Sequence, residues 1–208
     1  MNKVVVKVCG MREGGNIREV ESLGPDWMGF IFYSKSPRFV KEEPSYLPSK
    51  AKRVGVFVDA DLEYIARTTE RFDLDLVQLH GNESPEMVLR LRNALPNGIQ
   101  IIKAFNVAAS DDLRHVSDYE GVANYFLFDT KASLAGGNGS KFNWEVLAGY
   151  QGKTPFFLSG GIGPEDALAV RSFSHPSLYG VDLNSRFESV PAVKDIALLK
   201  HFLNQLKQ

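Results

Sequence analysis

The stretch Val4-Val5-Val6-Lys7-Val8-Cys9-Gly10 (VVVKVCG) joins a short apolar run to a turn that carries a cysteine and a glycine. β-Branched residues favour strands, and glycine is a common turn residue. The same unit, a short apolar run followed at once by polar or glycine residues, recurs seven more times in 208 residues. The eight runs are Val4–Val8, Met28–Tyr33, Val54–Val58, Leu74–Leu79, Ile99–Ala104, Tyr125–Phe128, Pro155–Leu158 and Leu178–Leu183. This repeated unit decides the fold class.

Most of these runs are continuously apolar, which is typical of parallel strands buried on both faces. Helix-like segments separate many of them, and Ser84 followed by Pro85 is a favourable helix start. The connections after the second and sixth runs look too short or too polar for full helices. The predicted helices are Asp61–Arg71, Ser84–Ala94, Pro164–Ser172 and Ala192–Leu206.

Eight strand-then-helix units in a chain of this length predict an α/β protein, a single-domain (β/α)8 (TIM) barrel over residues 1–208. The alternative is a doubly wound open sheet, which normally has five or six strands and needs an edge strand. No run looks like an edge strand, and no linker or low-complexity segment divides the chain. Closure of the sheet is therefore the favoured interpretation.

The composition is that of an ordinary globular protein, with 44% hydrophobic residues and a formal net charge of -1. This balance gives no support for a nucleic-acid or membrane partner, either of which would favour a basic excess. The single cysteine cannot form an internal disulfide, and no apolar run is long enough to span a membrane. We expect a cytoplasmic protein with a small-molecule substrate, and the sequence leaves monomer and homodimer both open.

A barrel of this type carries its active site at the C-terminal ends of the strands. Polar and glycine residues should therefore gather directly after each apolar run, and they do. The clusters are Cys9-Gly10, Tyr33-Ser34, Asp59, His80-Gly81, Asn106, Asp129-Thr130, Ser159-Gly160-Gly161 and the segment from Asp182 to Ser185.

Strand alternation places the Cys9 side chain on the same face as Lys7, while Val6 and Val8 point the other way. The valine face should meet the helices, so Lys7 and Cys9 should face the barrel mouth. A neighbouring ammonium group lowers the pKa of a thiol, which would suit a catalytic base. The other interpretation is a small buried apolar side chain, the more common fate of a lone cysteine.

Asp129 follows the aromatic run Tyr125–Phe128 directly. A carboxyl group in a partly desolvated place keeps its proton more readily and suits a general acid. A turn or helix-capping aspartate is an equally good interpretation of its position.

Two segments late in the chain are candidates for phosphate binding. Gly160 and Gly161 follow the seventh run, and Asp182, Asn184 and Ser185 end the eighth. Glycines let backbone N–H groups approach an anion, and barrels often bind phosphate in the loops after these two strands. Glycine also serves any tight turn, so the cluster alone is weak evidence.

Three further side chains could contact a substrate. Arg38 lies in the loop after the second run, where a guanidinium could hold a carboxylate through two hydrogen bonds, although most loop arginines are simply solvated. Gln78 and His80 share a strand face and could line the mouth, although a structural histidine is as good an interpretation. Four scattered histidines and one cysteine make no metal-ligand set, so we expect no metal.

Taken together and in order, these motifs resemble the phosphoribosylanthranilate isomerase family of tryptophan biosynthesis nearly end to end. The matching segments are KVCGM, GFIFYSKSPRFV, VGVFVD, VQLHGNE, FLFDTK, GGNGSKFNWEVL, FLSGGIGPEDA and GVDLNSRFES. The resemblance implies an Amadori rearrangement of N-(5-phosphoribosyl)anthranilate to 1-(2-carboxyphenylamino)-1-deoxyribulose 5-phosphate, without cofactor or metal.

The resemblance also implies residue roles. Cys9 matches the family's general base and Asp129 its general acid, while Arg38 would hold the anthranilate carboxylate. The phosphate loops match Gly160-Gly161 and the segment from Asp182 to Ser185.

The chain departs from the family pattern after the eighth run. It reads Asn184-Ser185-Arg186-Phe187-Glu188, where the family commonly has Ser-Ser-Gly-Val-Glu. The missing glycine leaves open whether backbone N–H groups approach the phosphate as in the family or whether Arg186 supplies charge instead. Asn138 and Asn143 depart from the usual pattern as well.

Two other functions were weighed against the isomerase. Another phosphosugar barrel enzyme, such as an epimerase or a synthase, would need a metal set or a carboxylate pair in place of Cys9 and Asp129, and neither is visible. A non-catalytic paralogue that binds a phosphorylated ligand would have no reason to keep Cys9, Asp129 and Arg38 together.

Overall fold

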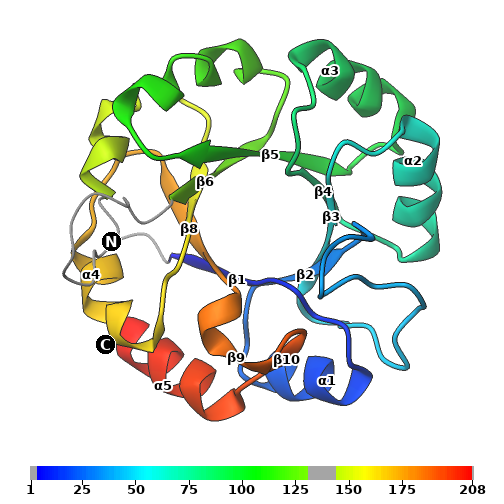
Figure 1. Cartoon of the computed structure of the whole chain (residues 1–208), viewed down its shortest axis with the longest axis vertical. Helices are drawn as coiled ribbons and strands as arrows, with labels where there is room; N and C mark the ends of the chain where they lie inside the picture. The colour runs from blue at the N-terminus through cyan, green and yellow to red at the C-terminus, as the bar shows by residue number, and fades with distance from the viewer. Residues whose placement is uncertain (1–3, 131–143, 208) are drawn as a thin grey trace.

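The computed structural model describes residues 4–130 and 144–207, so Asn138 and Asn143 lie outside the described residues. Within them, eight parallel strands close into a barrel in chain order, with β8 pairing back onto β1 (Figure 1). The predicted barrel is confirmed. The strands are β1 (Val5–Val8), β2 (Trp27–Ile31), β3 (Lys52–Phe57), β4 (Leu76–Leu79), β5 (Gln100–Val107), β6 (Tyr125–Thr130), β7 (Phe156–Ser159) and β8 (Leu178–Leu183).

Helices form a ring outside the barrel, as Figure 1 shows. The α-helices are α1 (Gly14–Ser22), α2 (Leu62–Arg71), α3 (Pro85–Ala94), α4 (Ala167–Ser172) and α5 (Ile196–Leu206). Short 3-10 helices are η1 (Ser110–Leu113), η2 (Val116–Tyr119), η3 (Trp144–Gly149), η4 (Pro164–Asp166) and η5 (Ser185–Phe187). Asp61 and Ser84 cap α2 and α3 by accepting backbone N–H bonds, so the predicted starts of these helices are confirmed.

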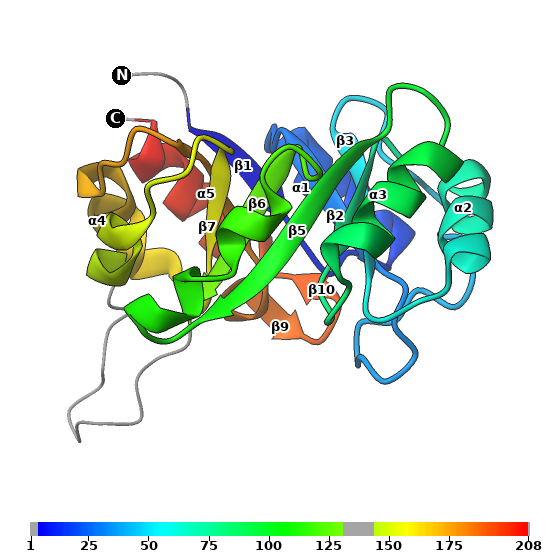
Figure 2. The same cartoon turned by 90° about the horizontal axis from the view of Figure 1, so that it is seen from above.

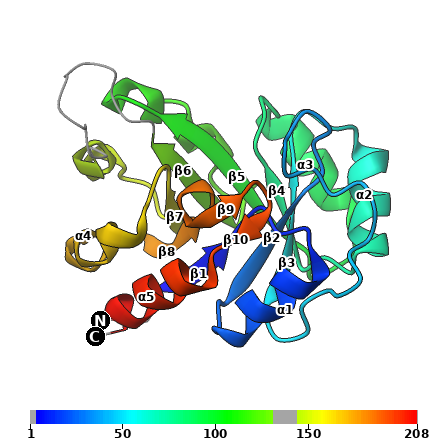
Figure 3. The same ribbon diagram turned by 60° about the horizontal axis from the view of Figure 1, so that its bottom comes forward.

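The helix predicted over Ala192–Leu206 begins later than expected. Ala192 has a positive φ of 70°, which interrupts a helix, and α5 starts at Ile196 after Asp195 caps it. The residues before it form a small antiparallel hairpin, β9 (Glu188–Val190) with β10 (Val193–Lys194). This hairpin follows β8 and η5 and lies at the end of the barrel where the strands terminate (Figures 2 and 3).

Two apolar layers fix which side chains face the barrel interior. Trp27, Leu127 and Phe157 belong to the cluster inside the barrel, whereas Val6 and Val8 belong to the larger cluster between strands and helices. The outward direction predicted for these two valines is confirmed. Lys7 and Cys9 alternate with these valines along the strand and therefore face the barrel interior. They lie between the apolar cluster inside the barrel and the mouth at the C-terminal ends of the strands.

No helix in the described parts of the chain combines the length and the apolar character needed to cross a membrane.

Candidate active site

A cavity of about 170 Å³ opens at the C-terminal ends of the strands. It is lined by every predicted site residue except Arg38, which lies beside it. The lining residues that the sequence had singled out are Cys9, Gln78, His80, Asp129, Gly160, Gly161, Asp182, Asn184 and Ser185, and Arg186 lines it too. Strand ends that are far apart in the sequence thus converge on one cavity, as the barrel closure requires.

A larger cavity of about 620 Å³ lies outside the barrel, between η3 and α4. Trp144, Phe173 and His175 are among its lining residues, and no strand end reaches it. Glu145 and His175 line it but no lysine or arginine of the described residues does, whereas the strand-end cavity combines Cys9, Asp129 and Arg186. The smaller cavity is therefore the candidate active site.

The Cys9 thiol lies beside a buried ion pair. Lys7 Nζ donates a hydrogen bond to Asp182 Oδ1 at 2.9 Å, and the two side chains are 0% and 6% exposed. Parallel pairing of β1 with β8 brings Lys7 opposite Asp182 in register, which creates this contact. Burial alone would lower the pKa of Lys7, but the charges of Asp182 and Cys9 raise it, so Lys7 is an ammonium.

The expected lowering of the Cys9 pKa is not the net result. Burial raises the pKa of the thiol by more than the charges of Lys7 and Lys194 lower it, and Asp182 adds to the increase. Strand alternation in the sequence predicts that Lys7 lies beside Cys9. It does not reveal that the Lys7 ammonium is also paired with the Asp182 carboxylate. Burial therefore leaves the pKa of Cys9 above its ordinary value.

Asp129 is the penultimate residue of β6 and lies between Asn106 and Ser159 on the neighbouring strands. Its side chain is 30% exposed, and the neighbouring Phe128 points away from it into the outer core. The carboxyl group is thus open to the cavity instead of sealed among aromatic rings, because alternation sends successive side chains to opposite faces.

His80 faces Asp129 across the cavity, with Nε2 3.5 Å from Asp129 Oδ2. On the other side of the ring, Gln78 Nε2 lies 3.0 Å from His80 Nδ1. Gln78 and His80 are thus brought together with Asp129, and the contact with Gln78 orients the His80 ring toward the carboxyl group of Asp129.

The loop that carries His80 is anchored by a buried glutamate that the sequence reasoning missed. Glu83 accepts hydrogen bonds from the backbone N–H groups of Asp59 and Gly81. Lys103 Nζ completes the anchor at 3.1 Å from Glu83 Oε2. Because these groups bridge β3, β4 and β5, the strand end that presents His80 is held rigidly.

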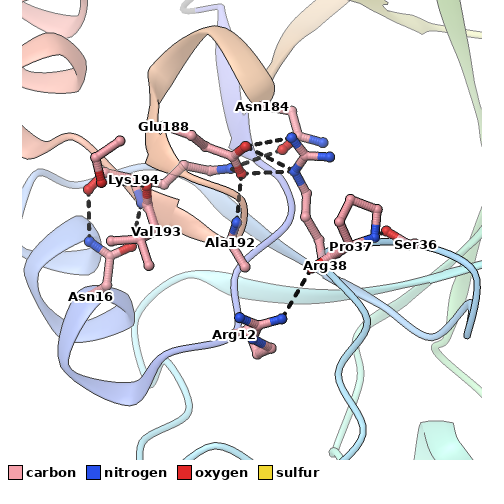
Figure 4. Close-up of polar contacts among 11 residues, drawn as sticks. Arg12, Asn16, Ser36, Pro37, Arg38, Asn184, Glu188, Ala192, Val193 and Lys194 are labelled. Carbon is pink, nitrogen blue, oxygen red and sulfur yellow. Dashed lines mark hydrogen bonds and ion pairs between the residues drawn. The ribbon is translucent and has the colours of Figure 1, made fainter.

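Arg38 is held by the β9–β10 hairpin (Figure 4). Its Nε lies 2.9 and 3.0 Å from the two carboxylate oxygens of Glu188, and its Nη2 lies 2.5 Å from Glu188 Oε2. Lys194 Nζ donates to Glu188 Oε1 at 2.6 Å and to Asn184 Oδ1 at 2.9 Å. Burial would raise the pKa of Glu188, but the hydrogen bonds from Arg38 and Lys194 lower it overall.

Glu188 and Lys194 were not among the predicted site residues. The sequence predicts a helix at Lys194, whereas the structure has Lys194 on β10 and Glu188 on β9. The available signal was Phe187-Glu188-Ser189-Val190-Pro191, whose alternation and proline fit a short strand and a turn better than a helix.

Gly10 lets Arg38 and Asn184 lie next to Cys9. Its φ is +78°, and an added Cβ would lie 2.6 Å from Asn184 Oδ1 and 2.7 Å from Arg38 Cδ. A side chain at this position would therefore push both groups out of place, besides straining the backbone.

We expect Gly10→Ala to destabilise the protein more than Gly24→Ala. Gly24 has nearly the same φ, +77°, but no atom lies within 4 Å of an added Cβ. Gly24→Ala should cost about 1–2 kcal/mol of backbone strain, and Gly10→Ala at least about 1 kcal/mol more from overpacking. Urea unfolding of both variants measures the difference. Equal losses would contradict the packing argument.

The glycine loop after β7 has the backbone shape expected of an anion site. Gly160 and Gly161 have φ values of 95° and 62°, which only glycine adopts readily. Arg186 on η5 lies against the same loop, with its Nε 3.9 Å from the Cβ position of Gly163. A guanidinium and a glycine loop therefore border the same part of the cavity.

Among the residues 4–130 and 144–207, no group of three or more His, Cys, Asp or Glu side chains has the arrangement of a metal site.

Comparison with known proteins identifies the family. The model of the family described as N-(5'phosphoribosyl)anthranilate (PRA) isomerase matches residues 6–205. The N-(5'-phosphoribosyl)anthranilate isomerase of Phocaeicola vulgatus is 49% identical over 205 residues, which cover 99% of this chain and 98% of that protein.

Solved structures agree. Phosphoribosyl anthranilate isomerase from Thermotoga maritima superposes with a TM-score of 0.82 at 31% identity, over 98% of each chain. A phosphoribosyl anthranilate isomerase in complex with reduced 1-(o-carboxyphenylamino)-1-deoxyribulose 5-phosphate superposes with a TM-score of 0.80 at 28% identity, over 98% of each chain. The near full-length match to the family model, a relative of 49% identity and the closed barrel together show that the chain belongs to the N-(5'-phosphoribosyl)anthranilate isomerase family.

Proposed function

We propose that this chain rearranges N-(5-phosphoribosyl)anthranilate to 1-(2-carboxyphenylamino)-1-deoxyribulose 5-phosphate, with Asp129 as general acid and Cys9 as general base. The observation that carries the proposed roles is the placement of both groups in one cavity of about 170 Å³, at the ends of β6 and β1. An acid and a base on different strands can act on different atoms of one bound substrate.

The reaction needs one proton given and one proton taken. Opening the ribose ring breaks the bond from C1 to the ring oxygen, and Asp129 supplies the proton that this oxygen requires as it leaves. Forming the enolamine then requires removal of the proton on C2, which is the role of Cys9. Positioned acids and bases each contribute about 100-fold to 10,000-fold to such steps.

The charges around Cys9 support a thiolate during the reaction. Both Lys7 and Lys194 lower the pKa of Cys9, although burial outweighs them in the unliganded protein. A substrate that carries positive charge after ring opening would add to the same effect. Lys7 and Lys194 are thus placed to stabilise the Cys9 thiolate when the proton on C2 is removed.

Groups in and beside the cavity suit the two anionic ends of the substrate. Arg38 would bind the anthranilate carboxylate, and Gly160, Gly161 and Arg186 would bind the phosphate. The proposal includes no metal and no cofactor. It assigns the activity to one domain that spans residues 1–208 and works in the cytoplasm.

We expect Arg186→Gly to weaken phosphate binding about 10-fold, on the scale of one exposed charge-assisted hydrogen bond. Competitive inhibition by inorganic phosphate at low salt measures the effect. Arg114→Gly is the matched control, since Arg114 is 72% exposed and pairs only with Asp111 among the described ion pairs. Unchanged inhibition in Arg186→Gly would show that its charge does not replace the missing glycine contact.

Fluorescence tests the proposed function directly. Phosphoribosylanthranilate is generated enzymatically, and its fluorescence is followed as the purified protein is added. We expect the signal to decay faster in proportion to the protein concentration. A decay no faster than spontaneous breakdown would contradict the proposed function.

A further inference from the structure

The cluster of Arg38, Glu188 and Lys194 has an order from the inside outward. The Lys194 side chain is fully buried, that of Glu188 is 4% exposed, and that of Arg38 is 18% exposed. Glu188 lies between the two cations and contacts both (Figure 4). Arg38 is therefore the outermost member of the cluster, and Glu188 contacts it from the side of the protein interior.

Glu188 uses one edge of the Arg38 guanidinium. Both of its carboxylate oxygens contact the edge formed by Nε and Nη2. A guanidinium has a second two-donor edge, formed by Nη1 and Nη2, which can hold another carboxylate in the same plane. The geometry therefore fixes the plane of Arg38, and no hydrogen bond among the described residues occupies Nη1.

The charges point to the same conclusion. The cluster contains two cations and one carboxylate, while the adjacent Lys7–Asp182 pair is balanced. One positive charge thus remains next to Cys9 without an anionic partner of its own. A carboxylate on the terminal edge of Arg38 would balance it.

We propose that Glu188 is a positioning residue that orients Arg38 toward the carboxylate of the substrate, and that Lys194 holds Glu188 in place. This inference rests on the proposed function, because it names the group that Arg38 recognises. By orienting Arg38, Glu188 would make the protein bind aryl-aminosugar phosphates that carry an ortho carboxylate more tightly than those that lack one.

The opposite role for Glu188 makes a different prediction. A carboxylate that competes with the substrate for Arg38 would weaken binding, and its removal would then strengthen it. The near-complete burial of Glu188 and its second contact with Lys194 argue against displacement, because a displaced Glu188 would leave Lys194 buried beside an empty position.

Affinity for two stable ligands tests the proposal. One is reduced 1-(o-carboxyphenylamino)-1-deoxyribulose 5-phosphate, and the other is the same compound without the carboxylate. We expect wild type to bind the first ligand more tightly than the second. In Glu188→Gln the ratio of the two affinities should fall at least about 10-fold. A misplacement of a positioned group by 1 Å can cost roughly 100-fold. Binding of the second ligand should change by less than about 3-fold, because it does not use Arg38.

Two further variants separate positioning from folding. Glu188→Asp keeps the charge but shortens the reach, so its preference should lie between those of wild type and Glu188→Gln. It also serves as the test if Glu188→Gln does not fold, which thermal unfolding reveals. Glu42→Gln, an exposed glutamate in the same loop as Arg38, should leave the preference unchanged.

The outcomes are distinct. An unchanged or increased preference for the carboxylate ligand in Glu188→Gln overturns the positioning role, and so does an equal loss of affinity for both ligands. Wild-type turnover of phosphoribosylanthranilate is measured in the same series. If wild type does not turn over phosphoribosylanthranilate, the proposed function is refuted. If wild type turns it over normally and Glu188→Gln keeps the wild-type preference for the carboxylate ligand, only the role of Glu188 is refuted.

Discussion

Replacing Cys9 with serine should lower kcat by at least about 100-fold, the usual scale for the loss of a general base. Serine is close to cysteine in size, so the cavity keeps its shape. Its hydroxyl group, however, is a far weaker acid than a thiol, and the charges of Lys7 and Lys194 cannot make it an effective base. Wild-type-like turnover in the variant would remove Cys9 from the mechanism.

The pH profile gives an independent measurement on Cys9. The base must be deprotonated, and the fraction of thiolate rises about tenfold per pH unit below the pKa. Since burial raises the pKa of Cys9 above its ordinary value, the rate at which iodoacetamide alkylates this single cysteine should keep rising with pH into the alkaline range. This rising limb should be absent in Cys9→Ser. A limb that is complete below pH 7 would contradict a buried thiol as the base.

Replacing Asp129 with asparagine should also lower kcat by at least about 100-fold, because an amide cannot deliver the proton that ring opening requires. Asparagine has the same shape and keeps the side chain next to His80, whose Nε2 lies 3.5 Å from Asp129 Oδ2. We therefore expect KM to change little. Steady-state kinetics of the fluorescence decay measures both parameters.

Asp61→Asn is the matched control for this substitution. Asp61 caps α2 outside the cavity, and asparagine caps a helix equally well. Its kcat should remain at the wild-type value. If Asp129→Asn behaves like this control, Asp129 has no part in proton transfer, and another group must protonate the ring oxygen.

The barrel could be predicted from the sequence because its signals are local. Each of the eight apolar runs coincides with a strand of the structure, give or take a few residues at the ends. The inward direction of Lys7 and Cys9 followed from strand alternation alone. The turn residues after the strands followed from composition, and most of them line the cavity.

The hairpin of Glu188–Val190 with Val193–Lys194 was not predicted, because three-residue and two-residue strands carry almost no periodic signal. A helix was expected over Ala192–Leu206, but the apolar residues recur at helical spacing only from Ile196, where α5 begins. Without the hairpin, neither Glu188 nor Lys194 could be connected to Arg38.

The sequence by itself determined the eight-stranded barrel and the set of polar residues at its mouth, because strand-forming runs, alternation and turns depend on neighbouring residues. Only the tertiary structure decided how the charges pair. Lys7 meets Asp182 across 175 residues and Arg38 meets Glu188 across 150. These pairings and the burial of Cys9 set its pKa and the orientation of Arg38, and they exist only once the closed barrel brings β1, β2 and β8 together.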